Sequence, residues 1–507
     1  MKLTACSRLR SARPLLAQLI LVAMLLAASG CSFPRKVTLV TTAPDGKGFI
    51  EAGSGKPFVP WGTNYYDPNT GWPPQMWQQF DTDRVAEHFQ AMSDIGVNCA
   101  RILLAAAAFQ PDPNTVDAEA LEKLDTIVTI ARRNGIRLIL TGPGHWEGEP
   151  AYWKPDRFAG QDALNALENF WTVVGQRYSG EPAILAWDLL SEPSMPWSLE
   201  SWQPRWNHWL EAKYENQEAL KTAWGDELGA DETLGSVTFA KDSGKRGNPR
   251  LLDWQLFREH LADQWVQRQV QVLRQVDPTH LITIGYIQWS YPVIRPGDPG
   301  LYSAFNPKRQ AQWLDFISIH FYPLMGRPWG SRDNWDRNLA YLQSLLAYCH
   351  TGKPVVLGEY GWYGGGAPPG RPIVTEDQQG RWITAEIQAS RRLVHGWLSW
   401  PFADNLDATD MSMYGGLVRH NLVHKLWTLR FRSYAKSLSI LPQPTPELPA
   451  FDVTPSLTAP LEDLMAMHQK HAALVQTAIE EAGPLPEIKL QTHYPMVGQK
   501  VEGEAVE

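Results

Sequence analysis

Cysteine is scarce in this chain: its 507 residues include only four. Cys6 and Cys31 lie near the N-terminus, while Cys99 falls in an expected strand and Cys349 at the end of a distant expected helix. We therefore expect no disulfide. Neither a C-x-x-C nor an H-E-x-x-H pattern occurs, so the sequence predicts no metal site and indicates no cofactor.

The chain also lacks an excess of positive charge. Lys and Arg total 46 against 54 Asp and Glu, which gives a net charge of -8. An acidic protein repels polyanions, so this balance argues against nucleic acid or a polyanionic substrate. Tryptophan, by contrast, is abundant, with 23 residues. Indole rings stack on the apolar faces of sugars, although most tryptophans in any protein belong to its core.

One long apolar run stands near the N-terminus. Residues 1–30 have a basic start, an apolar stretch from Leu15 to Ala28, and then A-S-G-C, which resembles a bacterial lipobox with Cys31 as the lipidated residue. The alternatives are a plain signal peptide or an uncleaved anchor. Ser32 follows the cysteine, and by resemblance to Gram-negative lipoproteins this predicts an exported lipoprotein, at the outer membrane or in the periplasm, that contacts the membrane through its lipid alone.

Short apolar runs alternate with amphipathic helical stretches between residues 48 and 440. This alternation is typical of repeated βαβ units. Eight strands with eight helical connections predict an α/β fold, the (β/α)₈ TIM barrel, in which the fifth connection is the least clear. The expected strands cover residues 58–63, 97–103, 136–141, 184–190, 281–286, 316–320, 355–359 and 397–400.

The remaining segments predict additions to this barrel. We expect a tether over 31–47, after the signal peptide. An insertion at 196–250 follows the fourth strand, where we expect it to overhang the active site. Beyond the barrel, residues 441–507 are expected to form a proline-rich linker, one amphipathic helix and a disordered tail.

Two glutamates follow buried apolar runs. The segment A-W-D-L-L-S-E-P, residues 186–193, ends in Glu192 and a proline, and P-V-V-L-G-E-Y-G, residues 354–361, carries Glu359. In a TIM barrel the C-terminal ends of the strands form the active site. Glycoside hydrolysis needs two carboxyl groups there, one to protonate the leaving oxygen and one to attack the sugar or activate water. The alternative is that both glutamates pair with arginines in a structural role.

Further polar residues fall at or just past other strand ends. Each alone has an ordinary explanation, such as a salt bridge, a surface histidine or a core tryptophan. Together they predict a ring of polar groups and one aromatic side chain around a single barrel mouth. They are Arg101 after the second strand, His145 after the third, Ser191 before Glu192, His320 and Tyr322 at the sixth, and Trp400 at the eighth.

This pattern resembles the clan A glycoside hydrolases, most closely family 5, the cellulase and mannanase family, over residues 58–435. Ser191 departs from that family, which has Asn before the acid/base. Separately, W-L-E-A-K-Y-E-N-Q-E-A-L-K-T-A-W-G at 209–225 is similar to segments of family 42 β-galactosidases. The residues that match family 5 positions are Arg101, His145, Glu192, His320, Tyr322, Glu359 and Trp400.

The resemblance implies a role for each carboxyl group. Glu192 would be the general acid/base and Glu359 the nucleophile of a retaining mechanism with a glycosyl-enzyme intermediate. The chemistry supports this order, because Arg101 and the Tyr322 hydroxyl can keep Glu359 ionised. His320 can in turn tune the proton of Glu192.

The other matched residues are expected to contact the substrate. His145 would bind a sugar hydroxyl and Trp400 would form the floor beneath the sugar at the cleavage site. Ser191 is too short to reach directly the carbon-2 hydroxyl that the family's Asn binds. Additional sugar-stacking candidates, each equally compatible with a packing role, are Trp61, Trp146, Trp289 and Trp362.

The sequence thus predicts a retaining β-glycoside hydrolase that cleaves O-glycosidic bonds of a β-linked poly- or oligosaccharide at the cell envelope. Two alternatives stay open at this point. One is a lipid-anchored, non-catalytic glycan-binding barrel, since binding sites can outlive catalysis. The other is a transglycosidase, which would use the same residues.

Overall fold

The computed structural model describes residues 37–144, 148–239, 248–292, 301–323, 332–445, 447–453 and 461–494. Expectations that concern the signal segment, Cys31, His145 and Trp146 lie outside the described residues. Within the described residues, no helix combines the length and the apolar character that a membrane span requires. Cys99 and Cys349 are both buried and free.

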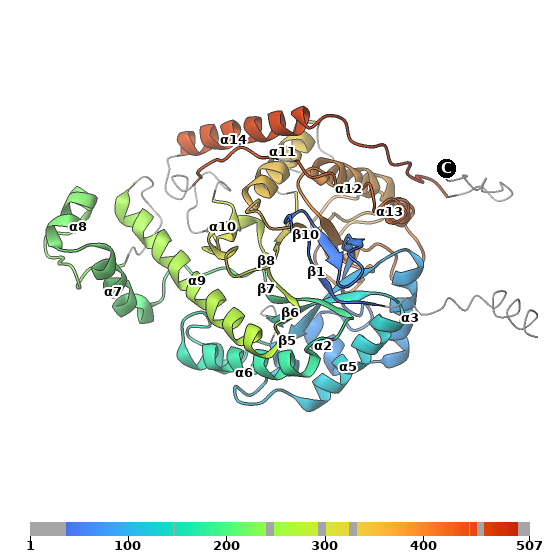
Figure 1. The fold of residues 1–507 in the computed structure, drawn as a ribbon, viewed down its shortest axis with the longest axis horizontal. Helices are drawn as coiled ribbons and strands as arrows, with labels where there is room; N and C mark the ends of the chain where they lie inside the picture. The colour runs from blue at the N-terminus through green and yellow to red at the C-terminus, as the bar shows by residue number, and fades with distance from the viewer. Residues whose placement is uncertain are drawn as a thin grey trace, which may run out of the picture.

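Eight parallel strands form a closed barrel, and its order around the ring follows the chain. The predicted TIM barrel is therefore confirmed, with most strand boundaries within two or three residues of the apolar runs that predicted them (Figure 1). Every residue of these strands is buried, as both faces of a parallel barrel require. The strands are β4 (Trp61–Tyr65), β5 (Cys99–Ala105), β6 (Arg137–Gly144), β7 (Ile184–Ser191), β8 (Leu281–Tyr286), β9 (Ile317–His320), β10 (Val355–Tyr360) and β11 (Gly396–Ser399).

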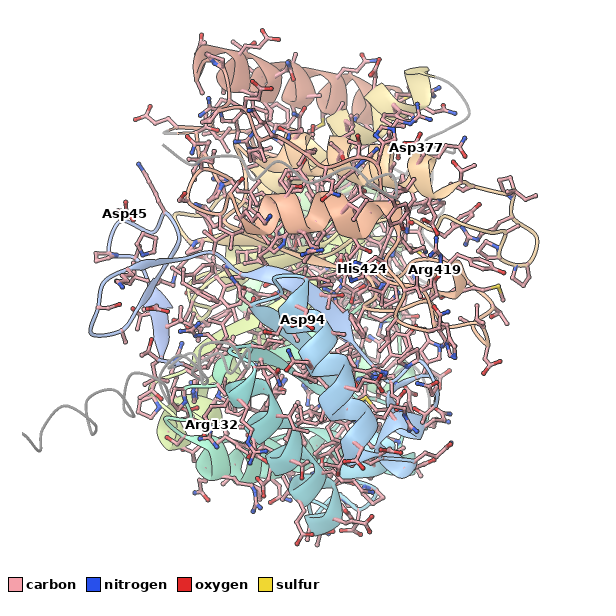
Figure 2. All side chains as sticks on the ribbon, turned by 90° about the vertical axis from the view of Figure 1, so that its right-hand side faces the viewer. Asp45, Asp94, Arg132, Asp377, Arg419 and His424 are labelled. Atoms are coloured by element: carbon pink, nitrogen blue, oxygen red, sulfur yellow. The ribbon has the colours of Figure 1, made fainter. Side chains whose placement is uncertain are left out.

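Helices cover the outside of the barrel. Asp81 and Asp117 cap two of them, each accepting a backbone N–H three residues on, which explains where these helices begin. Figure 2 shows the first of these helices ending at Asp94, beside the helix that carries Arg132. The helices between strands are α2 (Pro73–Gln78), α3 (Thr82–Asp94), α4 (Ala106–Phe109), α5 (Ala118–Arg133), α6 (Gln161–Tyr178), α9 (Pro249–Val276), α10 (Pro307–Gln310), α11 (Arg332–Tyr348) and α12 (Glu376–Ser390), and α13 (Leu426–Ala435) follows the last strand.

The connection between β8 and β9 was the least clear from the sequence. Among its described residues it contains only the short 3₁₀ turn η4 (Gln288–Ser290) and the four-residue α10. Asn306 caps α10 by accepting the backbone N–H of Lys308. A helix this short has too few apolar positions to produce a periodic pattern, which explains the ambiguity.

A small antiparallel sheet precedes the barrel, formed by β1 (Val40–Thr42), β2 (Phe49–Glu51) and β3 (Pro57–Phe58). Its Val40, Phe49 and Phe58 are buried in one cluster with side chains from six barrel strands, including Cys99 at the start of β5, and with Phe316 just before β9. The sheet therefore closes the N-terminal end of the barrel, and β1 lies over the barrel centre in Figure 1. The expectation of a simple tether up to residue 47 is wrong for 40–47, because these strands are too short and too polar to recognise from periodicity.

Among its described residues, the insertion after β7 contains four short helical elements before α9, the last of which is η3 (Gly225–Glu227). Helices α7 (Gln203–Lys213) and α8 (Gln217–Trp224) follow η2 (Glu200–Trp202), and Asn216, which lies between the two helices, caps α8. In Figure 1, α7 and α8 project from the side of the barrel beyond α9. Trp202, Trp206 and Trp209 contact the rings of Trp254 and Phe257 on α9. They form the insertion's own core and do not face the cleft.

The C-terminal segment packs on the barrel. Helix α14 (Leu461–Glu481) lies along α11, and the His471 ring bonds the Tyr291 hydroxyl and stacks on Phe451. Residues 482–484 accept hydrogen bonds from Arg392, and the Tyr494 hydroxyl donates to the carbonyl of His424. The expectation of a disordered tail is therefore wrong for 482–494. Buried arginines that satisfy backbone carbonyls leave no periodic signal in the sequence.

Candidate active site

The two predicted carboxyl groups meet at the C-terminal mouth of the barrel. Glu359 is the fifth residue of β10, and Glu192 follows the last residue of β7. One carboxylate oxygen from each, together with a ring nitrogen of His320, lie within 4.8 Å of one another. Retaining glycosidases place their carboxyl groups about 5 Å apart, whereas inverting enzymes leave roughly 6.5–9.5 Å for a water. The spacing here is that of a retaining pair.

A local distortion of β7 positions Glu192. The register with β8 shifts between Asp188 and Ser191, and Glu192 then adopts φ 50°, a left-handed conformation that is unusual for a residue with a side chain. Its backbone N–H donates to the carbonyl of Gly285 at 2.7 Å, which holds the turn. Such strain costs about 1–3 kcal/mol and persists where the surroundings enforce it, typically at functional sites.

Two donors hold Glu359. Arg101 Nη1 donates to its Oε1 at 2.7 Å, and the Tyr322 hydroxyl donates to its Oε2 at 2.8 Å. Arg101 is itself fixed, because its Nε donates to Asp188 at 2.8 Å and its Nη1 to the Asn64 side chain at 2.9 Å. All the groups around this guanidinium are buried, so the bonds are charge-assisted and little screened by water.

The two carboxyl groups differ in their electrostatic surroundings. Burial raises the pKa of Glu192 to about 7, opposed only by the charge of Arg101. Burial also raises the pKa of Glu359 and the charge of Glu192 adds to that rise, but His320, Arg101 and the Tyr322 hydroxyl oppose it. Because Glu359 receives the direct charge-assisted bonds, it is the carboxyl that stays ionised, and Glu192 is the one that holds a proton near neutral pH.

His320 lies between the two carboxyl groups. Its Nδ1 is 3.0 Å from Oε1 of Glu192 and 3.3 Å from Oε1 of Glu359. Burial lowers the pKa of His320 to about 4, so the ring is neutral. Its Nε2 and Arg101 Nη2 both stand within 3 Å of the point where a Cβ on Gly285 would lie. The positive charge of Arg101 disfavours a hydrogen on the nearby Nε2 of His320. The proton of the neutral ring is therefore on Nδ1, which faces the two glutamates.

A cavity of about 270 Å³ opens over the two carboxyl groups. Trp400 lines it, with its indole fixed by a hydrogen bond to Ser412 at 3.0 Å and by stacking on Trp72 at 5.5 Å between ring centroids. Ser191 also faces this cavity, as expected. The lining residues that the sequence did not single out are Leu103 on β5, Met411 at the start of the 3₁₀ turn η6 (Met411–Met413), and Trp72, Arg371 and Asp410 on loops.

Comparison with known proteins agrees with this geometry. A family model described as cellulase (glycosyl hydrolase family 5) matches residues 54–223, and the beta-galactosidase model of glycosyl hydrolase family 42 matches residues 157–361. The chain is a clan A glycoside hydrolase. Because neither model spans half of it, the glycosidase is assigned to the clan and not to one family.

Individual relatives are distant from this glycosidase. Mannan endo-1,4-beta-mannosidase 8 of Oryza sativa subsp. japonica is 24% identical over 356 residues, which cover 61% of this chain and 76% of the relative. A beta-galactosidase of Thermus thermophilus is also 24% identical, over 66% of this chain and 52% of its own length. This chain thus spans between half and three quarters of these relatives.

Solved structures support the fold alone. An exo-beta-1,4-mannosidase from an Opitutaceae bacterium superposes with a TM-score of 0.54 at 18% identity, over 78% of this chain and 62% of that protein. The beta-galactosidase of Rahnella sp. R3 superposes with a TM-score of 0.61 at 16% identity, over 76% of this chain and 57% of that protein.

A second cavity of about 400 Å³ adjoins Glu192 on its other side. The start of the insertion contributes Pro196 and Leu199 to it, with Glu149 and Trp153 opposite. Glu192 lines both cavities of the glycosidase, whereas Glu359 lines only the first. Among the described residues of the insertion, Pro196 and Leu199 border this cavity, so the expected overhang is met only at the start of the insertion.

Three of the stacking candidates can be placed. Trp289, on η4, is partly buried and packs against the hydrophobic core. Trp61 is fully buried at the start of β4, stacked on Phe431, so it is a core residue and the expectation for it is wrong. The expected strand over 58–63 begins three residues before β4 and puts Trp61 past its middle, so the sequence did not exclude Trp61 from the mouth. Trp362 follows β10 and lies under the guanidinium of Arg371, at 5.6 Å.

Glu192, His320 and Glu359 also offer the atom types that ligate metals. A cation bound by this group would lie beside Arg101, whose Nη1 already stands 2.7 Å from Glu359. That fixed positive charge opposes a second one at the same oxygen. These three residues beside Arg101 are therefore better suited to glycoside cleavage by two carboxyl groups than to binding a metal.

Proposed function

We propose that this glycosidase cleaves β-linked mannose- or galactose-containing glycans with retention of configuration, with Glu359 as nucleophile and Glu192 as general acid/base. The observation that carries the proposal is the pair of carboxyl groups within 4.8 Å, one held by Arg101 and Tyr322 and the other with its pKa raised by burial to about 7. The choice of sugars rests on the mannosidases and galactosidases among the similar proteins.

In the first step, Glu359 attacks the anomeric carbon while Glu192 gives its proton to the glycosidic oxygen. The bond between that carbon and oxygen breaks, and the leaving sugar departs as a neutral alcohol. In the second step, Glu192, now ionised, takes a proton from a water that attacks the same carbon and frees Glu359. His320 Nδ1–H lies close enough to stabilise whichever of the two carboxylates is charged.

The two cavities suggest how the substrate lies. The acid/base must reach the oxygen between the glycone, the sugar attacked, and the aglycone, which leaves. Since Glu192 lines both cavities and Glu359 only the first, we assign the cavity over Trp400 to the glycone and the cavity along Pro196 to the aglycone. A volume of about 270 Å³ is large enough for one sugar ring with its hydroxyls.

The same proposal includes an envelope location. The A-S-G-C segment supports lipidation at Cys31, which would tether the barrel to a membrane through its N-terminal end. The small sheet that begins at Val40 closes that end of the barrel, so the catalytic mouth, at the opposite end, would face away from the tether.

A hydrolysis screen tests the proposed chemistry. Wild-type protein, Glu192→Gln and the surface control Glu122→Gln should be compared on nitrophenyl β-mannoside and β-galactoside and on β-linked manno- and galacto-oligosaccharides. We expect turnover of at least one series, lost in Glu192→Gln on oligosaccharides and unchanged in the control. Sugar products would indicate hydrolysis and longer oligomers transglycosylation. No turnover of any β-glycoside would contradict the proposal.

A further inference from the structure

Arg371 is the one cationic side chain among the described residues that line the glycone cavity. It stands in the loop between β10 and α12, which folds back on itself: Gly365 and Gly366 exchange backbone hydrogen bonds with Val374, and the Tyr363 hydroxyl donates to the carbonyl of Pro372 at 2.9 Å. These bonds hold the loop in place next to Arg371. The side chain is thus presented at the cavity rim on a fixed support.

This guanidinium has no carboxylate partner among the described residues. The other acidic groups in the cavity lining are otherwise engaged. Glu359 is bound by Arg101, and Asp410 accepts the backbone N–H of Ser412 at 2.8 Å. Among the described residues, the ring that lies beneath Arg371 is Trp362, at 5.6 Å, and stacking of this kind orients a guanidinium while leaving its N–H edges free.

An exposed, pre-oriented arginine at a substrate cavity is suited to a planar anion, because its N–H groups can form two parallel bonds to a carboxylate. Neutral sugars give it no such partner. Long polyanions are disfavoured by the acidic charge of the chain as a whole. The ligand chemistry that satisfies both observations is a sugar with a single carboxylate.

We propose that Arg371 selects glycans whose glycone-side sugar carries a carboxylate, as in a uronic acid. This inference rests on the proposed function, since it names the substrate class of the same site. Arg371 would be a specificity-determining residue: it binds the carboxylate, while Glu359 and Glu192 carry out the cleavage.

The test compares matched substrates that differ only in the carboxylate. Nitrophenyl β-mannoside, β-galactoside and β-glucoside are each paired with their uronide and assayed with wild type, Arg371→Gln and Arg381→Gln. Arg381 is the control because it lies on the outer face of α12, paired with Asp377. We expect wild type to prefer at least one uronide. Arg371→Gln should lower the uronide-to-neutral ratio of kcat/KM roughly 10- to 100-fold, mainly through KM, as loss of a charged hydrogen bond does. Arg381→Gln should leave the ratio unchanged.

The possible failures are distinguishable. Cleavage of neutral sugars with no uronide preference overturns the inference and leaves the proposed function intact. An equal fall in kcat/KM of Arg371→Gln on both substrates of a pair also overturns the inference, because Arg371 would then act by supporting the structure of the loop. No cleavage of any substrate overturns the proposed function itself, and the inference with it.

Discussion

Replacing Glu192 by glutamine should stabilise the folded protein, and the gain should grow with pH. Burial raises the pKa of this carboxyl from 4.5 to about 7. A carboxyl whose pKa is raised in the fold favours folding below its unfolded pKa and loses that contribution as pH rises through the folded pKa. At about 1.4 kcal/mol per pKa unit, ionised Glu192 costs the fold about 3 kcal/mol above pH 7. Glutamine has nearly the same shape and carries no charge.

The gain should therefore be under about 1 kcal/mol at pH 5 and about 3 kcal/mol at pH 8.5. For a chain of this length the larger figure corresponds to a rise of about 3 °C in melting temperature. Thermal unfolding of wild type, Glu192→Gln and the exposed control Glu122→Gln at both pH values measures it. A variant that is no more stable than wild type at pH 8.5, or equally stabilised at both pH values, would refute the assignment of the buried proton to Glu192.

Three further outcomes follow from the site and the packing. Tyr322→Phe removes a hydroxyl that donates to Glu359 at 2.8 Å, so kcat/KM should fall on the order of 10- to 100-fold and the acid limb of the pH profile should move upward, as a pH–rate series will show. Ser191→Asn should raise kcat/KM on plain β-sugars, since the longer amide can reach the carbon-2 hydroxyl; no change on plain or 2-acetamido substrates would mean that residue 191 does not contact the sugar. Truncation after residue 453 should lower the melting temperature by several degrees with kcat unchanged, because α14 packs on α11 and contributes no described residue to the lining of either active-site cavity; loss of activity at a temperature where the truncated barrel is still folded would contradict this.

The barrel and the centre of its active site were accessible from the sequence for one physical reason. Parallel strands buried on both faces appear as uninterrupted apolar runs, so their ends can be located within a few residues. The C-terminal ends of all eight strands meet at one mouth, and residues such as Arg101, Glu192 and Glu359 are brought together by that topology alone. The bonds from Arg101 and Tyr322 to Glu359 follow the expected chemistry.

What the sequence did not indicate lies mostly on loops or in docked segments. Trp72, Arg371 and Asp410 reach the cavity from irregular segments, where no periodicity links position to direction. Asn64 and Asp188 lie inside strands, and their role in fixing Arg101 depends on which strands are neighbours across the barrel. The terminal segments were misjudged because their packing relies on short strands and on buried arginines bonded to backbone carbonyls.

The central claim, that Glu359 is the nucleophile and Glu192 the acid/base, is tested most directly by azide rescue. An alanine at the nucleophile opens the face of the sugar opposite the leaving group, so azide should restore turnover of Glu359→Ala and yield the α-glycosyl azide from a β-glycoside. In Glu192→Ala, azide should attack the intermediate from the β face and yield the β-glycosyl azide. The configuration of the azide product, measured by NMR, decides between the roles. A β-azide from Glu359→Ala together with an α-azide from Glu192→Ala would contradict the account.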